Sequence, residues 1–213
     1  MPAPDEFAAR AAAALREVTG VPGAVDVRRD SLTGLFDDRA LHKALTETIR
    51  ATERDGGNTG LLFIDLDRFK NVNDRHGHVT GSRILIQVAG LVDTAARQAG
   101  GFAARYGGDE FVVVLPGADL DGCLRHGERL RTILAATMLA GGEPPRRGPL
   151  VHVTCSIGAA SMRAEAVGDR NETPSPAGAA TRLLQLADNA MYQAKHAGRN
   201  RSAAAGAAAT GVA

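Results

Sequence analysis

The sequence predicts an α/β fold, an α+β sandwich in which a central, mainly antiparallel sheet is flanked by helices. Two observations lead to this prediction. Apolar segments of strand length alternate along the chain with longer segments of helical periodicity. Two of the apolar segments are separated only by Gly107-Gly108-Asp109-Glu110, a spacing typical of a β-hairpin and therefore of antiparallel pairing. We expect strands at 61–66, 102–106, 111–115 and 150–161, and helices near 37–54, 81–99, 119–139 and 180–197.

The apolar pattern justifies these elements in chain order. The run from Leu61 to Leu66 is almost continuously apolar, as expected of a strand buried on both faces, and it becomes acidic at Asp65 and Asp67. These two carboxylates are two residues apart, so we expect them on one face. Further along, the runs 101–106 and 111–115 form the hairpin. The last helix has a core-facing apolar stripe made of Leu183, Leu184, Ala187, Ala190, Met191 and Ala194.

Composition divides the chain into three regions. Residues 1–24 are expected to form an N-terminal helical segment, because an Ala-rich stretch at 5–18 places Phe7, Ala11, Leu15 and Val18 on one face. This helix could pack on its twin or on the domain, and the sequence leaves both open. Residues 25–201 form the main domain, with Pro/Gly-rich loops at 141–148 and 164–178. Residues 202–213 are an Ala/Gly-rich tail that we expect to be disordered.

Charge and composition exclude several classes of protein. The net charge of +1 over 213 residues argues against a general nucleic-acid binder. No apolar run approaches the ~18 residues that a membrane span requires, and no signal-peptide pattern opens the chain. Cys123 and Cys155 lack metal-ligand spacing, so we interpret them as reduced, buried residues. We therefore predict a cytoplasmic protein with no nucleic-acid or membrane partner.

Carboxylates gather at the ends of the predicted strands. Asp65, Asp109 and Glu110 are hard oxygen ligands of the kind that suit Mg²⁺, which binds through one or two carboxylates plus substrate phosphates. Gly107 and Gly108 would give the hairpin turn φ > 0 freedom and let a bulky ligand approach the backbone. Taken alone, each motif is most often an ordinary solvated turn. Their combination favours a site for phosphoryl transfer.

The segment at 69–81 follows the acidic strand directly. It mixes Lys70, Asn73, Asp74, His78 and Gly81 without the apolar periodicity that a core element needs. We therefore predict a functional loop at 69–81.

With these motifs in this order, the chain resembles the GGDEF family, the diguanylate cyclases that condense two GTP molecules into cyclic di-GMP and release pyrophosphate. The resemblance covers 30–201 and implies a ferredoxin-like, palm-polymerase-type fold. It rests on the segments 30–35, 65–74, 105–111, 154–158 and 187–201.

The resemblance implies a metal site and a catalytic group. Asp65, the backbone carbonyl of Leu66 and Asp109 would hold Mg²⁺, with Mn²⁺ as the alternative ion. Glu110 would complete the acidic cluster and help to activate the attacking 3′-hydroxyl.

The resemblance also implies substrate contacts. The backbone at Phe69 and Lys70 would meet the β- and γ-phosphates. Gly107 and Gly108 are also expected among the substrate-binding residues. Lys195 and Arg199, taken as four residues apart on a helix and hence on one face, would clamp the triphosphate. The alternative for this pair is a solvated basic face. Asn73 would read the nucleobase, its alternative being a loop-capping role.

Ser82 departs from the family pattern, because most members carry an Asp here that accepts hydrogen bonds from guanine. Guanine offers N1–H and N2–H₂ donors, whereas adenine N1 is an acceptor, so a carboxylate opposes adenine and a hydroxyl does not. A serine here resembles the hybrid promiscuous subset of the family, which accepts ATP as well as GTP and makes 3′,3′-cyclic GMP-AMP beside cyclic di-GMP. The alternative is that Ser82 only N-caps the following helix and guanine specificity is kept.

A second departure concerns feedback. In many family members an Arg-x-x-Asp motif before the hairpin binds product dimers, but these positions here are Gln98 and Gly101. We therefore expect no product inhibition through that site.

Together these features predict a dinucleotide cyclase that condenses two purine nucleoside triphosphates, GTP and ATP, into a cyclic dinucleotide with release of pyrophosphate. Two 3′-hydroxyls must attack two α-phosphates, so two sites must face each other and we expect a homodimer. One alternative is a guanine-specific cyclase that makes only cyclic di-GMP. The other is a catalytically silent GGDEF binding module, although such modules commonly lose the hairpin carboxylates that are intact here.

Overall fold

The computed structural model describes residues 28–142, 148–163 and 175–206. The predicted helix at 5–18 lies outside the described residues, as do most of the two predicted Pro/Gly-rich loops and the end of the predicted tail. The elements are α2 (Asp38–Asp55), β1 (Asn58–Leu66), α3 (Phe69–His76), α4 (His78–Gln98), β2 (Phe102–Gly107), β3 (Glu110–Pro116), α5 (Leu120–Ala136), β4 (Met138–Ala140), β5 (Leu150–His152), β6 (Cys155–Arg163), α6 (Pro176–His196) and β7 (Arg201–Ala204).

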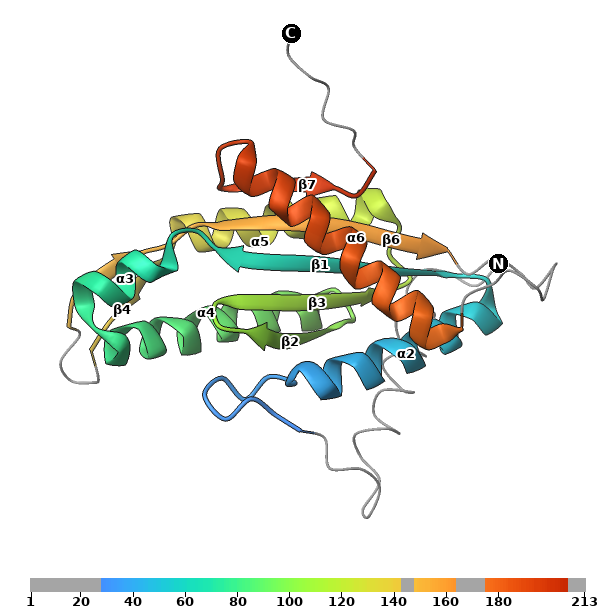
Figure 1. Ribbon diagram of the computed structural model, residues 1–213, viewed down its shortest axis with the longest axis horizontal. Coiled ribbons are helices and arrows are strands. Elements are labelled where there is room, and N and C mark those ends of the chain that lie inside the picture. Colours follow the sequence, from blue (N-terminus) through green and yellow to red (C-terminus); the bar gives the residue numbers. More distant parts are fainter. Residues whose placement is uncertain (1–27, 143–147, 164–174, 207–213) are drawn as a thin grey trace, which may run out of the picture.

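The predicted α/β sandwich with a mainly antiparallel sheet is confirmed. The main sheet has the order β2-β3-β1-β6-β7 and is antiparallel throughout except for the pair β6–β7. Helices α2 and α6 cover one face of this sheet, while α4 and α5 cover the other (Figure 1). Each face therefore has its own apolar core.

The alternation along β1 decides which face the acidic strand end takes. Leu62 and Ile64 pack in the core under α4 and α5, whereas Leu61 and Phe63 pack in the core under α2 and α6. Because successive side chains point to opposite faces, Asp65 lies on the face covered by α6. The same alternation along β3 puts Glu110 on that face, since Val112 packs there too.

Glycine at position 158 lets α6 lie directly on the sheet. A Cβ atom at Gly158 would collide with the carbonyl oxygen of Ala187 and the amide nitrogen of Met191. Both atoms belong to the α6 backbone, which has no room to give. The height of α6 above β6 is therefore set by this glycine.

The region 119–161 differs from the prediction. Helix α5 ends at Ala136, and the predicted strand 150–161 is two strands, β5 and β6. Strand β5 pairs with β4 in a separate two-stranded sheet. Strand β6 stays with the main sheet, where the N–H of Asp67 donates to the carbonyl of Thr154 at 2.8 Å and continues the β1–β6 register beyond the Leu66–Cys155 pair.

Two further predictions were wrong. Segment 69–81 is not a loop but helix α3 and the start of α4; only Phe69 of α3 is buried, so the helix has no apolar stripe for the sequence to reveal. The tail predicted to be disordered from residue 202 begins instead with most of strand β7, which pairs in parallel with β6. Alanine and serine suffice there because the backbone hydrogen bonds of the ladder hold the strand.

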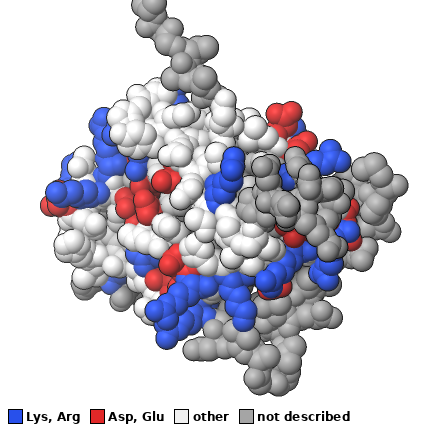
Figure 2. Space-filling model, turned by 45° about the vertical axis from the view of Figure 1, so that its right-hand side comes forward, with Lys and Arg blue, Asp and Glu red and all other residues white. Residues whose placement is uncertain are grey.

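The charges of the surface are mixed. On the face that Figure 2 shows, basic groups are bordered by acidic ones, in keeping with the net charge of +1. Among the residues that the structure describes, none of the helices is both long and apolar enough to cross a membrane.

Candidate active site

The acidic residues meet at the end of β1 and the tip of the β2–β3 hairpin. Asp65 and Glu110 are direct partners in the antiparallel register of β1 and β3. Directly opposite residues share a face, with Cβ atoms about 5 Å apart. Asp109 adjoins them, since its backbone carbonyl accepts the N–H of Leu66 at 3.3 Å. The structure thus brings the predicted carboxylates together.

The site is short of positive charge. Burial raises the pKa of Asp65 above its ordinary 3.8, the ion pair with Lys195 opposes this, and the carboxylates of Asp109 and Asp67 raise it further. Burial, and next the neighbouring Asp65 carboxylate, raise the pKa of Glu110 above 4.5. Like charges placed directly opposite each other are destabilising unless a cation lies between them.

Lys195 supplies one such cation. Its Nζ lies 2.7 Å from Oδ2 of Asp65, which is only 7% exposed. Within the described ranges no group of three or more His, Cys, Asp or Glu side chains is arranged to hold a metal ion. Mg²⁺ needs no such cage, because it binds through one or two carboxylates and completes its shell with waters and substrate phosphates. The donor set of Asp65, Asp109 and the Leu66 carbonyl fits that requirement.

The N-terminus of α3 follows the acidic strand end directly. Its N-cap, Arg68, has φ of +56° and makes no side-chain capping hydrogen bond. The first N–H groups of a helix lack intrahelical partners and attract anions. The backbone at Phe69 and Lys70, for which the family resemblance implies phosphate contacts, occupies this position, with Phe69 buried and the Lys70 side chain exposed.

Asn73 and Ser82 come from the two helices that meet after this turn. A Cβ atom at Gly81 would collide with Oδ1 of Asn73, so the glycine lets α3 pack closely on α4. Ser82 is the next residue and lies inside α4, whose N-cap is Gly77. The alternative that Ser82 caps its helix was therefore wrong, and its hydroxyl has no capping role.

Lys195 and Arg199 do not share a helical face, contrary to the prediction. Helix α6 ends at His196, and Arg199 lies in the following turn with φ of +64°. Its N–H donates to the carbonyl of Ala194 at 3.1 Å. Glycine at 198, with φ of +114°, allows the chain to turn before the arginine.

Asp67 has a different role from Asp65, although the sequence spacing predicts both on one face. Its carboxylate accepts hydrogen bonds from Thr154 Oγ1 at 2.6 Å, Ser156 Oγ at 2.7 Å and the N–H of Asn200 at 3.0 Å. Asn200 in turn accepts from Arg131 of α5 at 2.8 Å. Asp67 thereby ties the end of β1 to the turn that carries Arg199.

The hairpin tip is braced by a contact that the sequence analysis missed. Arg105 donates from Nη2 and Nε to the carbonyl of Gly108 at 2.7 and 3.0 Å, and its Nη1 lies 3.1 Å from Oδ1 of Asp30. Asp30 also accepts from the N–H and Oγ1 of Thr33. The 30–35 motif signalled the family but gave no hint of this long-range partner. Of the two hairpin glycines, Gly108 alone has a positive φ, +43°.

Replacing Asp30 with asparagine should destabilise the fold by about 1–3 kcal/mol at neutral pH, because a charged hydrogen bond is lost. Burial alone would raise the pKa of Asp30, but hydrogen bonds from Thr33 and Arg105 outweigh it and hold the pKa below 3.8. A carboxyl group whose pKa is lower in the folded than in the unfolded protein stabilises the fold at pH values above the unfolded pKa. This stabilisation is lost as the pH falls through the folded pKa. The difference between Asp30→Asn and wild type in chemical denaturation should therefore shrink below pH 3.8. The exposed Asp55→Asn is the control; a pH-independent difference would contradict this account.

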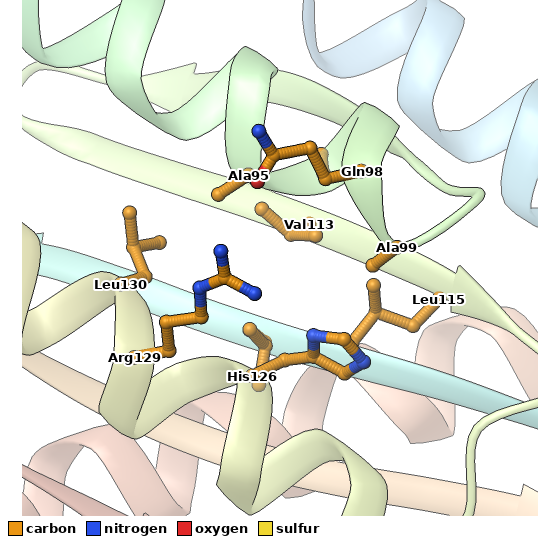
Figure 3. A pocket seen from close by; sticks show the side chains of 10 residues that line it. Ala95, Gln98, Ala99, Val113, Leu115, His126, Arg129 and Leu130 are labelled. Atoms are coloured by element: carbon orange, nitrogen blue, oxygen red, sulfur yellow. The ribbon is translucent and has the colours of Figure 1, made fainter.

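Gln98 and Gly101, the two positions of the missing inhibitory motif, have different surroundings. Gln98 borders a small pocket between α4 and α5, together with His126 and Arg129 (Figure 3). A Cβ atom at Gly101 would collide with the backbone carbonyl of Val114, so this backbone has no place for an aspartate there.

Comparison with known proteins gives first the class of domain. In the solved structures, the GGDEF domain of DgcB from Caulobacter crescentus in complex with c-di-GMP superposes with a TM-score of 0.71 at 29% identity, covering 86% of this chain and 99% of that one. The GGDEF domain of YfiN from Pseudomonas aeruginosa gives 0.68 at 32% identity, covering 84% and 94%. The architecture is that of a GGDEF domain.

Sequence comparison agrees. Residues 27–201 match the family described as "Diguanylate cyclase, GGDEF domain", and the chain belongs to this family. It is 37% identical to diguanylate cyclase DgcP of Pseudomonas aeruginosa over 81% of this chain and 23% of DgcP. It is 35% identical to diguanylate cyclase DosC of Escherichia coli over 88% of this chain and 37% of DosC. The chain thus spans less than two fifths of the length of these relatives.

Proposed function

We propose that the chain is a dinucleotide cyclase that joins two purine nucleoside triphosphates into a cyclic dinucleotide and releases pyrophosphate. The observation that carries the proposal is the Asp65–Glu110 pair, which faces Lys195 beside the uncapped N-terminus of α3. The names of the relatives DgcP and DosC support it, as does the c-di-GMP in the DgcB complex.

Asp65, Asp109 and the carbonyl of Leu66 would hold Mg²⁺, with Mn²⁺ as the alternative. When bound, such an ion polarises phosphoryl oxygens and neutralises the charge that develops on them. The closely apposed carboxylates with raised pKa values support this assignment, because a cation between them would relieve their repulsion.

The protein groups around the carboxylates would bind and orient the triphosphate. The N–H groups at Phe69 and Lys70 would donate to β- and γ-phosphate oxygens, and Lys195 and Arg199 would neutralise the phosphates from the other side. Lys195 pairs with Asp65 in this structure, so it would turn from that carboxylate to the phosphate as the nucleotide binds.

Glu110 would take the proton of the attacking 3′-hydroxyl. Its raised pKa brings it nearer to the range in which a carboxylate is an effective general base. The 3′-oxygen then forms a bond to the α-phosphorus while the bond between that phosphorus and the bridging oxygen breaks, and pyrophosphate leaves. Closing the ring needs the same reaction at a second site, so the active species would be a homodimer.

The nucleobase would lie between α3 and α4, against Asn73 and Ser82. We propose that Ser82 admits adenine as well as guanine, so that ATP is a second substrate and cyclic GMP-AMP a second product. The guanine-specific alternative fits the names of the relatives equally well. The silent-module alternative is disfavoured because both hairpin carboxylates are present and lie at the site.

Changing Ser82 to aspartate should raise the preference for GTP over ATP by roughly ten- to a hundredfold, the effect of one charged hydrogen-bonding group. The measurement is the ratio of cyclic di-GMP to cyclic GMP-AMP formed from an equimolar mixture of GTP and ATP. Ser82→Ala, which adds no carboxylate, is the matched control and should not gain this preference. Wild-type protein that yields only cyclic di-GMP would refute promiscuity and leave the cyclase proposal standing.

A further inference from the structure

A groove of about 600 Å³ opens on a side of α3 other than the one that packs on α4. Its walls are α3, the strand β5 and the turn 198–200, at the end of the molecule where Figure 1 shows α3 and β4. Val72 and Arg75 contribute from α3 at helical spacing and hence from one side of that helix, and Arg68 contributes from its N-cap. Asn73 contacts Gly81 on another side, so the groove is separate from the space between α3 and α4.

The lining of this groove, which we call the α3 groove, is strongly basic. It includes Arg68, Arg75, His76, His152 and Arg199. None of these arginines forms an ion pair with a residue that the structure describes.

The carboxylate in the lining does not offset this charge locally. Asp67 is the acidic residue of the α3 groove, and its two oxygens already accept hydrogen bonds from Thr154, Ser156 and Asn200. The ring of His152 is fixed in the wall, because its Nε2 lies 2.5 Å from the carbonyl of Ala135 and must carry a proton there. The guanidinium groups are therefore left to face a ligand.

These observations define the chemistry of the ligand. Several guanidinium groups around a hollow of this size suit a small molecule with several negative charges, and guanidinium recognises phosphate by paired hydrogen bonds. We propose that the α3 groove is a second anion site that binds a polyphosphate chain, the chemistry shared by free pyrophosphate and by the triphosphate end of a nucleotide. The site goes beyond the proposed cyclase reaction, for which Arg199 alone of its lining arginines was needed.

Calorimetric titration of inorganic pyrophosphate into the full chain tests this proposal. Arg75→Gln, at an exposed position outside the proposed catalytic groups, should weaken pyrophosphate binding by about tenfold, the effect of losing one charged hydrogen bond in partly solvated surroundings. Arg68→Gln, at the N-cap of α3 in the same lining, should weaken it as well. Arg182→Gln, near the start of α6 and remote from the groove, is the matched control and should change nothing.

Repeating the titration with a saturating non-hydrolysable GTP analogue identifies the source of the polyphosphate. Pyrophosphate that still binds, and still responds to Arg75→Gln, shows a groove for the free anion. If the analogue blocks pyrophosphate and itself binds more weakly to Arg75→Gln, the triphosphate end occupies the groove. Pyrophosphate and analogue affinities that are both unchanged in Arg75→Gln and Arg68→Gln, or equally reduced in Arg182→Gln, would overturn the proposal.

The outcome is independent of the cyclase proposal. Pyrophosphate binding is measured without turnover, and at saturating GTP without added pyrophosphate the initial rate of Arg75→Gln should stay within about twofold of wild type, because no proposed catalytic group is touched. A chain without cyclase activity could still bind pyrophosphate in the α3 groove, and an active cyclase could lack this site.

Discussion

Changing Asp109 to alanine should reduce the rate of turnover by about a thousandfold or more, because several kcal/mol of transition-state charge stabilisation depends on its carboxylate. The fold should survive. Asp109 lies at the hairpin tip, and its hydrogen bond with β1 is accepted by its backbone carbonyl from the N–H of Leu66, which alanine keeps. The measurement is the initial rate of pyrophosphate release, with the melting temperature recorded for the same preparation.

The control for Asp109→Ala is Asp121→Ala, which removes an exposed carboxylate from the first turn of α5. It should leave the rate of pyrophosphate release unchanged. An Asp109→Ala protein that is folded and turns over within a few fold of wild type would contradict the proposed metal site.

Changing Gly158 to alanine should cost about 2–3 kcal/mol of unfolding free energy, because the added methyl group must push α6 away from the sheet. It should also reduce turnover by about a hundredfold, because Lys195 is carried by the same helix and a displacement of about 1 Å is enough for such a loss. Urea denaturation and the initial rate measure the two effects.

Gly90→Ala provides the matched control for this substitution. Gly90 lies within α4, and a Cβ atom there meets nothing within 4 Å. Alanine should therefore stabilise the protein by about 0.5–1 kcal/mol through its higher helix propensity. If Gly158→Ala were as stable as wild type, the close packing of α6 on β6 would not be what positions Lys195.

The parts of the structure that depend on local pattern could be predicted from the sequence. The hairpin follows from two apolar runs around a glycine turn. The position of Glu110 opposite Asp65 depends instead on the long-range pairing of β1 with β3, which local pattern does not give. The helix that carries Lys195 follows from its apolar stripe. The fold class needed only these elements and their order.

Features that depend on distant partners could not be predicted. Asp67 accepts hydrogen bonds from Thr154 and Asn200, which are distant in the sequence, so its bracing role could not be predicted. The contact of Arg105 with Asp30 is likewise long-range and has no sequence pattern. Short elements were also missed. Helix α3 buries little and β7 consists of small residues, so neither has the apolar pattern from which elements are recognised.

Product analysis of the wild-type chain tests the central claim most directly. The purified protein is incubated with Mg²⁺ and GTP, and the products are separated by mass at several protein concentrations. The account predicts cyclic di-GMP together with pyrophosphate, at a rate per chain that rises with concentration as two sites come together. Folded protein that binds GTP and yet forms no cyclic dinucleotide at any concentration would contradict it.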